Sequence, residues 1–562
     1  MSQIVECVPN FSEGRDLAVI KQITDEIEKV DGAKLLDVDP GADTNRTVVT
    51  LVGSPNAVVE AAFQAIKKAS ELIDMRQHSG AHPRMGATDV CPFIPVANMT
   101  MAECAELARR LGKRVGEELD IPVYLYEFAA SREDRRNLAD IRAGEYEALA
   151  EKMKDADFAP DFGSAKFNAR SGATVIGARK FLIAYNVNLN TRNRKMASDI
   201  ALDIREKGRA KRDKNGKIIR DADGKMVKVP GTLKAVKAVG WYIDEYKMAQ
   251  ISMNLVDFDV TPLYKAFDEV CEQATRRGLR VTGSELVGLV PLSAMLDAGR
   301  YYLKKQGNST AVPEKELVRL AIQSMGLSEI TPFDPEEKII EYQLRDKKKP
   351  SLVRMPVDDF ADELASDSPA PGGGSVAALA GSLGAALVNM VGVLTFGKKG
   401  YEAVTEEVET LSLKAGALKE KLLNLVDEDT ESFNQVMAAM RMKKKTEEEK
   451  NARAKAIEKA TQESAKVPLK VMESALEVGK LAVRMAAVGN QNSLSDAGVG
   501  ILMARAALEG AAMNVLINLQ GLTDTAFVEK ITGQVTSLRG EMKELAETNL
   551  GSIFDTLQTP GK

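Results

Sequence analysis

The pattern of apolar and polar positions changes character near residue 350. Before about residue 330, short apolar and β-branched runs alternate with stretches whose apolar positions recur every three or four residues. This alternation predicts an α/β or α+β layered fold. The predicted strands are Ala33–Val38, Arg46–Val52, Pro122–Phe128, Thr174–Asn186, Met248–Val256 and Leu279–Val281. The predicted helices are Asn56–Ile73, Met101–Leu119, Val260–Arg277 and Glu314–Met325.

From Ser351 onward the β-like alternation disappears and long segments rich in Ala, Leu, Met, Glu and Lys take over. The predicted helices here are Val357–Ala365, Ser375–Phe396, Val404–Met442, Thr446–Met485, Ser495–Leu519 and Asp524–Thr548. Helices of this number and length are typical of a helical bundle. We therefore expect a multidomain chain with two α/β subdomains, a charged linker and an all-α bundle, at residues 1–179, 180–328, 329–350 and 351–562.

One segment is apolar enough to be considered as a membrane-spanning helix. Ser368–Gly397 contains no charged residue and is long enough to cross a bilayer. It opens with prolines and glycines, carries Asn389, and is rich in the small residues that allow close helix packing. It is the only such segment we identify, so we expect a core helix buried on all sides and no membrane span.

Composition excludes several classes of function. The net charge is −5 with acidic and basic residues well mixed, which gives no global basic field for nucleic acid. The four cysteines are scattered without a Cys-x-x-Cys pair, which argues against disulfide scaffolds and zinc sites. A reduced cytoplasmic location fits this usage, and the N-terminus has no secretory signal pattern. The basic segment Arg205–Pro230 predicts a surface hairpin with an Asp-Gly turn, either a plain solvated ribbon or a guide for an acidic ligand.

The only two histidines, His78 and His82, lie four residues apart in a short loop-like stretch. Histidine exchanges protons near neutral pH, so this stretch is the candidate for proton-transfer chemistry. Asp39 follows a predicted strand and is the candidate to orient His82 and raise its basicity. Nearby polar loops supply Asn10, Arg15, Asn45 and Arg84 as substrate-binding candidates. The spaced carboxylates lack a pattern that requires a metal, so no metal is expected.

In the second half, a glycine-rich loop leads directly into a predicted helix. The loop residues Gly372, Gly373, Gly374 and Ser375 are candidates to bind a carboxylate or phosphate at the helix N-terminus. No Gly-Lys-Ser/Thr or Gly-x-Gly-x-x-Gly follows, so ATP and NAD are not supported.

A carboxylate interrupts the apolar stripe of the predicted helix Val404–Met442. The stripe continues at spacings of three and four only if Asp429 occupies one of its positions, and a carboxylate on a buried face is costly unless it is paired or functional. Asp427 is the alternative on the same segment. Asn490 and Asp496 offer further polar groups.

Taken together, these motifs resemble the formiminotransferase-cyclodeaminase family. The first half matches in VECVPNFSEGRD, DVDPGADTNRTV, HSGAHPRMGATDVCPFIP, RRNLADIRAGEYEAL, GATVIGARKFLIAYNVNL and GSELVGLVPL. The second half matches in SPAPGGGSVAALAGSLGAAL, LVDEDTESF, GNQNSLSD and NVLINL. The resemblance covers nearly the whole chain, and the hairpin at about 208–230 is the one departure.

The resemblance implies two linked reactions of histidine degradation and one-carbon metabolism. A formimino group passes from N-formimino-L-glutamate to tetrahydrofolate, a polyglutamylated cosubstrate, and the product is then cyclised to 5,10-methenyltetrahydrofolate with loss of ammonia. It implies that His82 is the transferase acid and base, that Arg84 or Arg15 binds the glutamate carboxylates, and that Asp429 or Asp427 serves the second reaction. It also implies a homo-oligomer.

Two alternatives remain open at this stage. One keeps the fold with a glutamate formyltransferase fused to a methenyltetrahydrofolate cyclohydrolase. The other is a non-catalytic folate-binding scaffold, because a fold can be retained without its chemistry.

Overall fold

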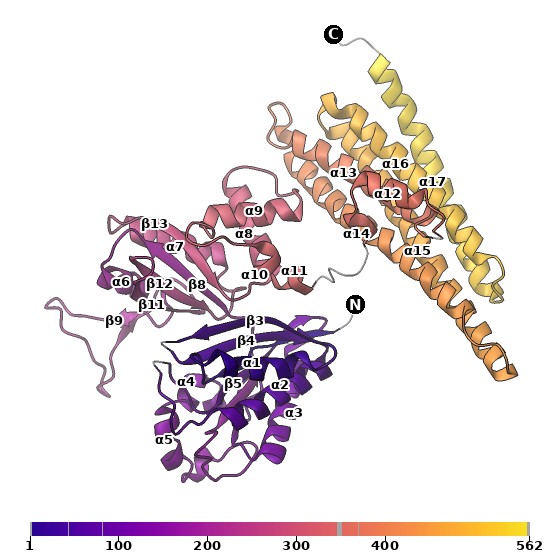
Figure 1. Ribbon diagram of the computed structural model, residues 1–562. Helices are drawn as coiled ribbons and strands as arrows, with labels where there is room; N and C mark the ends of the chain where they lie inside the picture. Colours follow the sequence, from indigo (N-terminus) through magenta and orange to yellow (C-terminus); the bar gives the residue numbers. More distant parts are fainter. Residues whose placement is uncertain (1–2, 43, 81, 345–350, 369, 559–562) are drawn as a thin grey trace. The chain divides into compact units, whose positions relative to one another are not determined.

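The computed structural model describes residues 3–42, 44–80, 82–344, 351–368 and 370–558. The chain forms two compact units, the first comprising residues 1–295 with 322–345 and the second residues 296–321 with 346–562. The first unit contains both α/β sheets and the second contains the helical bundle (Figure 1). The predicted fold class is confirmed.

The first sheet has seven strands in the order β1-β4-β2-β5-β7-β6, with β3 paired to β4. Only the β5–β7 and β6–β7 pairs are parallel. The strands are β1 (Ile4–Cys7), β2 (Asn10–Phe11), β3 (Ala33–Gly41), β4 (Arg46–Gly53), β5 (Thr88–Ala97), β6 (Val123–Glu127) and β7 (Thr174–Ala178). Its helices are α1 (Leu17–Glu28), α2 (Pro55–Leu72), α3 (Met101–Leu119), α4 (Leu138–Ile141) and α5 (Glu145–Lys152).

The two faces of this sheet differ in chemistry. Side chains alternate between faces along a strand. Cys7 and Phe11, like Leu51, belong to the apolar core that includes α1, α2 and α3. Glu6 and Asn10 are their immediate neighbours in β1 and β2 and therefore point to the opposite face. That opposite face is where the candidate site of the first unit lies.

The second sheet is antiparallel in the order β11-β12-β8-β13. Its strands are β8 (Ile183–Leu189), β11 (Val236–Ile243), β12 (Met248–Leu255) and β13 (Val281–Val287), and it carries α6 (Arg194–Ile204) and α7 (Leu263–Thr275). The predicted strand Thr174–Asn186 is therefore two strands, because β7 belongs to the first sheet and β8 to the second. The predicted strand at Leu279–Val281 marks only the beginning of β13.

The segment from residue 329, predicted as a linker, is structured up to residue 344. It forms α10 (Pro335–Lys338) and α11 (Ile340–Leu344), with Ile339 and Tyr342 buried. Ile339 bridges to Val290 after the second sheet. The structure thus differs from the predicted linker here, and the linker's last residues, 345–350, lie outside the described residues.

The basic hairpin is an exposed ribbon between β9 (Arg209–Ala210) and β10 (Lys228–Val229). It contains the predicted Asp-Gly turn, in which Gly224 donates to the Asp221 carbonyl at 3.1 Å. An equivalent turn precedes it, with Gly216 donating to the Asp213 carbonyl at 3.0 Å. The ribbon is therefore built from two successive copies of one turn.

Long helices form the second unit. They are α12 (Val357–Leu364), α13 (Gly373–Thr395), α14 (Thr405–Met440), α15 (Glu447–Val488), α16 (Leu494–Leu519) and α17 (Thr525–Gln558). Before them along the chain come α8 (Leu292–Lys305) and α9 (Glu314–Met325). The short 3₁₀ helices of the chain are Glu133–Arg135, Ala156–Phe158, Leu352–Arg354, Glu402–Val404 and Gln491–Ser493.

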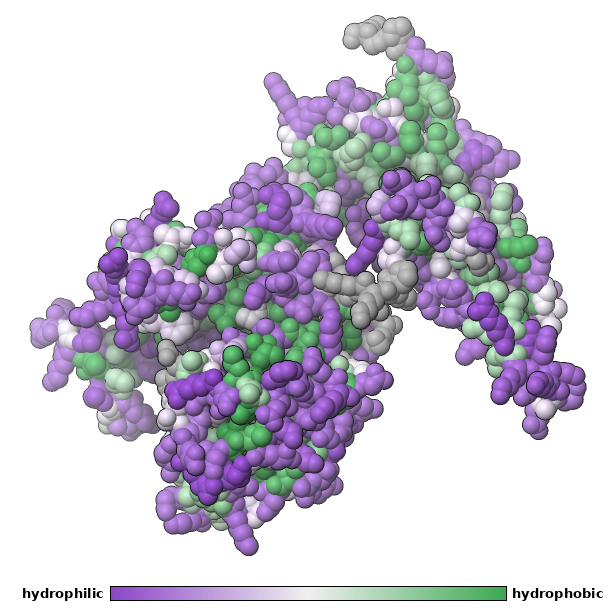
Figure 2. All heavy atoms as spheres, viewed as in Figure 1, coloured by the Kyte–Doolittle hydropathy of each residue, from purple (hydrophilic) through white to green (hydrophobic). Residues whose placement is uncertain are grey.

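The helix α13 is not buried on all sides, which corrects the expectation. Leu383 and Leu394 on α13 are half-exposed, and on its neighbour α16 Ile517 is half-exposed and Met513 is 70% exposed. Apolar atoms are visible at the surface of this unit in Figure 2. Among the described residues two segments, Gly373–Thr395 and Gln491–Leu519, are long and apolar enough to cross a membrane, whereas only the first is identified from the sequence.

Candidate active sites

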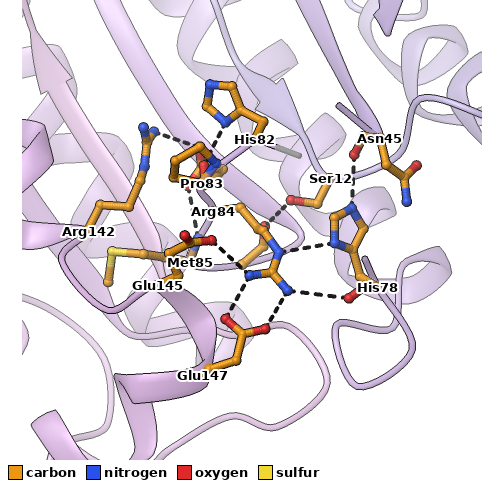
Figure 3. Close-up of polar contacts among 12 residues, drawn as sticks. Ser12, Asn45, His78, His82, Pro83, Arg84, Met85, Arg142, Glu145 and Glu147 are labelled. Carbon is orange, nitrogen blue, oxygen red and sulfur yellow. Dashed lines mark hydrogen bonds and ion pairs between the residues drawn. The ribbon is translucent and has the colours of Figure 1, made fainter. Parts of the chain in front are cut away.

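His82 lies in the loop that leads into β5 (Figure 3). Its Nδ1 is 2.6 Å from the Pro83 carbonyl oxygen and 2.8 Å from Nη1 of Arg46. A carbonyl only accepts a hydrogen bond and a guanidinium only donates, so the tautomer decides which contact Nδ1 makes. When Nδ1–H donates to Pro83, Nε2 is the unprotonated nitrogen. No contact of Nε2 appears among the described residues, and this nitrogen is available for proton transfer.

The loop can take this position because of a close approach between two chain segments. A side chain at Gly80 would place its Cβ 2.2 Å from the Thr44 carbonyl oxygen, so only glycine fits there. Asn45 then joins the same two segments, because its side chain accepts from Gly14 N at 3.0 Å and donates to the Ser79 carbonyl at 2.9 Å. The predicted substrate-binding residue Asn45 is thus used within the protein.

Beside His82, two arginines share one carboxylate. Arg46 Nη1 and Arg142 Nη2 donate to Oδ2 of Asp89 at 2.8 and 2.6 Å. The Asp89 side chain is 1% exposed, and its Oδ1 accepts from the backbone N–H of Met85 at 3.0 Å. Arg46 also donates from Nε and Nη2 to Oδ1 of Asn10, the Nε bond measuring 2.9 Å. The cluster is therefore a buried, hydrogen-bonded network.

Burial is the largest cause of the pKa shifts in this cluster. The pKa of His82 is lowered to about 4, first by burial and then by the neighbouring Arg46, while the Pro83 carbonyl opposes the shift. Burial also lowers the pKa of Arg46 to about 10, against the opposing effect of Asp89. At neutral pH the imidazole is therefore uncharged, the form that accepts a proton.

The structure does not place Asp39 as the residue that orients His82. The Asp39 side chain is exposed on β3, and the described contacts of the imidazole are with Arg46 and Pro83. Asp39 is paired with Val48 in the β3–β4 ladder, and no described hydrogen bond or ion pair joins its side chain to His82. The carboxylate that acts on His82 is Asp89, which raises its pKa and holds Arg46 against it.

Arg84 also differs from its predicted role. Its guanidinium is buried and bound to Glu145 at 3.1 Å and to Glu147 at 2.6 Å (Figure 3). Its Nε donates to His78 Nδ1 at 3.2 Å, and His78 Nε2 in turn donates to the Asn45 carbonyl at 2.9 Å. Arg84 and His78 therefore fasten the loop. Arg15 is exposed and donates from Nε to the Ala42 carbonyl at 2.9 Å.

Sequence reasoning did not single out Arg46, Asp89 or Arg142. Each lies inside a motif quoted for the family resemblance, in DTNRTV, GATDV and ADIRAG, but far from the others along the chain. No periodicity marks them, and only the fold brings β4, β5 and the end of α4 together. Among the described residues, no group of three or more His, Cys, Asp or Glu side chains could hold a metal ion.

In the second unit, Asp429 lies against the start of α13. Ser375 Oγ lies 3.1 Å from its Oδ2 and 3.0 Å from the Val426 carbonyl oxygen, two acceptors for one hydroxyl proton. The backbone N–H of Ser375 also bonds to Asp429. A Cβ added to Gly374 would lie 2.3 Å from Asp429 Oδ1, so the carboxylate needs glycine at this position. The anion at this helix N-terminus is thus Asp429 itself, and burial raises its pKa despite the hydrogen bonds from Ser375.

Asp427 has a different environment. Its Oδ2 accepts from Ser351 Oγ at 2.7 Å and its Oδ1 accepts from the backbone N–H of Leu352 at 2.8 Å. Both oxygens therefore anchor the first residues of the bundle. Of the two candidate aspartates, Asp429 is the one that faces the glycine-rich loop.

Asn490 and Asp496 do not lie near Asp429 within one chain. Asn490 accepts from Lys398 Nζ at 2.6 Å, and its backbone N–H donates to Thr395 at the C-terminal end of α13. The 23 residues of α13 span roughly 30 Å, and Asp429 lies at the opposite end. Asp496 is in the first turn of α16, six residues after Asn490. The residue that does approach the loop is Asn514, 3.3 Å from the Cβ position of Gly373.

Comparison with known families covers nearly the whole chain. Residues 4–179 match the formiminotransferase domain, N-terminal subdomain, and residues 184–345 match the formiminotransferase domain. Residues 356–537 match formiminotransferase-cyclodeaminase.

Individual relatives support the same assignment. The chain is 44% identical over 559 residues to the formimidoyltransferase-cyclodeaminase of Sus scrofa, covering 99% of each chain. The glutamate formimidoyltransferase of Streptococcus pyogenes serotype M1 is 43% identical over 54% of this chain and 94% of its own length. The methenyltetrahydrofolate cyclohydrolase of Methylorubrum extorquens is 41% identical over 36% of this chain and 96% of its own length. Full-length identity to the first of these shows that the chain belongs to the family of bifunctional formimidoyltransferase-cyclodeaminase enzymes.

Proposed function

We propose that the first unit transfers a formimino group from N-formimino-L-glutamate to N5 of tetrahydrofolate, with His82 as the proton carrier. The observation that carries the proposal is the uncharged imidazole with Nε2 left available beside a buried arginine cluster. N5 must lose a proton as it attacks the formimino carbon, and the departing glutamate nitrogen must gain one. A single imidazole performs both transfers in turn, each contributing roughly 10²- to 10⁴-fold.

The second unit then cyclises the product with Asp429 as its proton carrier. N10 attacks the carbon of the protonated formimino group, and the N10 proton passes to Asp429. Asp429 returns this proton to the amino nitrogen, and the carbon–nitrogen bond breaks so that ammonia leaves. The product is 5,10-methenyltetrahydrofolate. The raised pKa of Asp429 supports this role, because a carboxylate whose pKa lies nearer neutrality is the stronger base and readily returns the proton.

One observation favours an alternative to cyclisation, namely that the second unit is a methenyltetrahydrofolate cyclohydrolase. The similarity to the Methylorubrum extorquens methenyltetrahydrofolate cyclohydrolase covers 96% of that protein. A protein similar to the second unit is thus named for a reaction of methenyltetrahydrofolate, the product of the proposed cyclisation. Purified chain supplied with 5-formiminotetrahydrofolate distinguishes the two. Ammonia release with appearance of methenyltetrahydrofolate supports cyclisation, and loss of supplied methenyltetrahydrofolate without ammonia supports the cyclohydrolase.

The two halves are tested together with one pair of variants. His82→Gln is expected to abolish formimino transfer and to leave cyclisation of supplied 5-formiminotetrahydrofolate intact, and Asp429→Asn is expected to do the reverse. Formylglutamate offered in place of formiminoglutamate tests the glutamate formyltransferase alternative on the same preparations. If both activities survive both substitutions, the residue assignments are wrong.

The assembly and setting are also proposals. The half-exposed apolar side chains of α13 and α16 support a homo-oligomer in which a second copy covers them, because large exposed apolar patches mark interaction sites. The buried cysteines Cys7, Cys91 and Cys104 form no disulfide among the described residues, which supports a reduced cytoplasmic location. The cosubstrate is tetrahydrofolate with a polyglutamate tail.

A further inference from the structure

The cluster beside His82 carries an unbalanced positive charge. Arg46 and Arg142 are 14% and 12% exposed at their side chains, and they share one carboxylate, Asp89. The imidazole of His82 is uncharged, so it does not alter this balance. Two largely buried cations against one anion leave a surplus charge of +1 on the arginines beside His82. The neighbouring group, Arg84 with Glu145 and Glu147, has one excess negative charge, but its two carboxylates are bound to Arg84. Buried charges are costly unless they are paired, which indicates that an anion belongs beside His82.

A second observation also indicates a missing acceptor. The buried Nε of Arg142 has no hydrogen-bond partner among the described residues, although its Nη2 is bound to Asp89. The oxygens of Asp89 are occupied by Arg46, Arg142 and Met85 N–H. Buried polar atoms almost always have a partner, so an unpaired guanidinium N–H in a candidate site points to a ligand.

We propose that Arg46 and Arg142 bind the α-carboxylate of the formimino donor directly beside His82, and that this carboxylate supplies the negative charge that makes the imidazole an effective base. The proposal rests on the proposed function, since it takes N-formimino-L-glutamate as the donor. It replaces Arg84 and Arg15 as the carboxylate-binding residues. Arg84 is already bound by Glu145 and Glu147, and Arg15 is exposed.

The chemistry of the donor fits this arrangement. In formiminoglutamate the α-carboxylate carbon is two bonds from the nitrogen that leaves. The same nitrogen must receive the proton that His82 carries. A donor held by its α-carboxylate therefore presents its leaving nitrogen close to the imidazole. Arginine N–H groups bind carboxylates through short, charge-assisted hydrogen bonds with defined geometry, which fixes the donor's orientation.

The bound carboxylate also changes the base strength of His82. Arg46 from β4 and Arg142 from the end of α4 lower the His82 pKa, whereas Asp89 from β5 and the Pro83 carbonyl raise it. With burial the result is about 4, which is a weak base at neutral pH. A carboxylate within hydrogen-bond reach of both arginines cancels much of their field and raises the imidazole pKa by about 1–3. Proton abstraction then becomes effective only when the donor is present.

The decisive experiment measures the His82 pKa directly. In the full-length chain labelled with [¹³Cε1]histidine, only two resonances are expected, and His82→Gln identifies that of His82. Titration between about pH 3 and pH 8, which brackets a midpoint near 4, is run without ligand, with saturating L-glutamate, and with 4-aminobutanoate, which lacks the α-carboxylate. Glutamate is expected to raise the His82 midpoint by at least about one pH unit, whereas 4-aminobutanoate leaves it unchanged. His78 serves as the internal control.

Two further measurements complete the test. Because linkage is reciprocal, glutamate that raises the His82 pKa by one must also bind about tenfold more tightly once the pH has fallen through the His82 midpoint. Arg142→Gln raises the midpoint of the free protein, weakens glutamate binding and reduces the change that glutamate causes, whereas the exposed-residue control Arg76→Gln behaves as the wild type. Melting temperatures of both variants verify folding.

Two results would overturn the inference. One is glutamate binding that leaves the His82 midpoint unmoved, and the other is no glutamate binding at millimolar concentration. Transferase activity is assayed on the same preparation. Formimino transfer with an unmoved midpoint removes this inference and leaves the proposed function standing. Absence of transfer from formiminoglutamate to tetrahydrofolate removes the proposed function itself.

Discussion

Alanine substitutions along Gly372, Gly373 and Gly374 give the sharpest test of the second site. A Cβ at Gly372 meets nothing within 4 Å, and one at Gly373 lies 3.3 Å from Asn514 Nδ2. One at Gly374 would lie 2.3 Å from Asp429 Oδ1. The three positions are consecutive at the start of α13 and differ mainly in what the added methyl group meets. The expected order of damage to cyclodeaminase activity is therefore Gly374→Ala, then Gly373→Ala, then Gly372→Ala.

The magnitude follows from the contacts that must break. To reach an ordinary contact distance the Asp429 carboxylate moves by about 1 Å, which disrupts its bonds to Ser375 Oγ and N–H. Hydrogen bonds to charged groups contribute about 1.5–3 kcal/mol, and each 1.4 kcal/mol corresponds to a factor of ten. Gly374→Ala is expected to lower kcat/KM for cyclisation about 10- to 100-fold, Gly373→Ala only a few-fold, and Gly372→Ala not measurably.

The assay is ammonia release from supplied 5-formiminotetrahydrofolate, with formimino transfer by the first unit as the internal control. Alanine favours helix over glycine by about 1 kcal/mol in a helix interior, so the substitutions do not act by weakening α13 through helix propensity. Melting temperatures verify this. Equal activity of all three variants, or a Gly374→Ala enzyme within twofold of wild type, refutes the assignment of Asp429.

Three other outcomes follow from the structure. Asp427→Asn is expected to lower the melting temperature with cyclisation retained at low temperature, because Asp427 anchors Ser351 and Leu352; an unchanged melting temperature contradicts this. Glu6→Gln is expected to stabilise the protein more at pH 8 than at pH 5. Burial raises the pKa of Glu6 to about 8, so the folded protein keeps a proton that the unfolded chain releases above about pH 4.5, and stability falls as pH rises between these values. A pH-independent difference in the free energy of unfolding argues against that raised pKa. The acid limb of transferase kcat/KM, which reports the free enzyme, is expected near pH 4; a limb near 6.5 shows that His82 is unperturbed or not the base.

Much of the architecture is predictable from the sequence because periodicity reports local geometry. Most helices of the bundle begin and end close to their predicted limits, since three-to-four spacing over many residues leaves little ambiguity. The exception is α17, which ends at Gln558, ten residues beyond the predicted Thr548. The gap in the apolar stripe of α14 places Asp429 on the buried face, and the structure shows its side chain half-buried. Near Arg179 the sequence predicts the start of a second subdomain but runs Thr174–Asn186 as one strand, where two strands of different sheets follow one another.

The site of the first unit is only partly predictable. The scarcity of histidine identifies the loop with His82, but its partners come from three separate segments that no spacing rule connects. Asp39 is a reasonable candidate by its place at a strand end, yet its side chain is exposed and no described contact joins it to His82. Whether a charged side chain faces a ligand or a neighbour depends on tertiary contacts, as Arg84 shows with its bonds to Glu145 and Glu147.

The two proposed proton carriers share one physical principle. For both His82 and Asp429 burial is the largest cause of the pKa shift, and in both it favours the uncharged form. The consequences are opposite. An uncharged imidazole is ready to accept a proton but weakly basic, so it needs an added negative charge to become effective. A carboxylate with a raised pKa becomes more basic as it is buried, so it needs only to be kept in place, as Ser375 and Gly374 do. The first site therefore depends on its substrate for base strength and the second on its backbone. We therefore expect substitutions that alter the charge beside His82 to impair formimino transfer more than cyclisation. Substitutions that add side-chain atoms at Gly374 should impair cyclisation more than transfer.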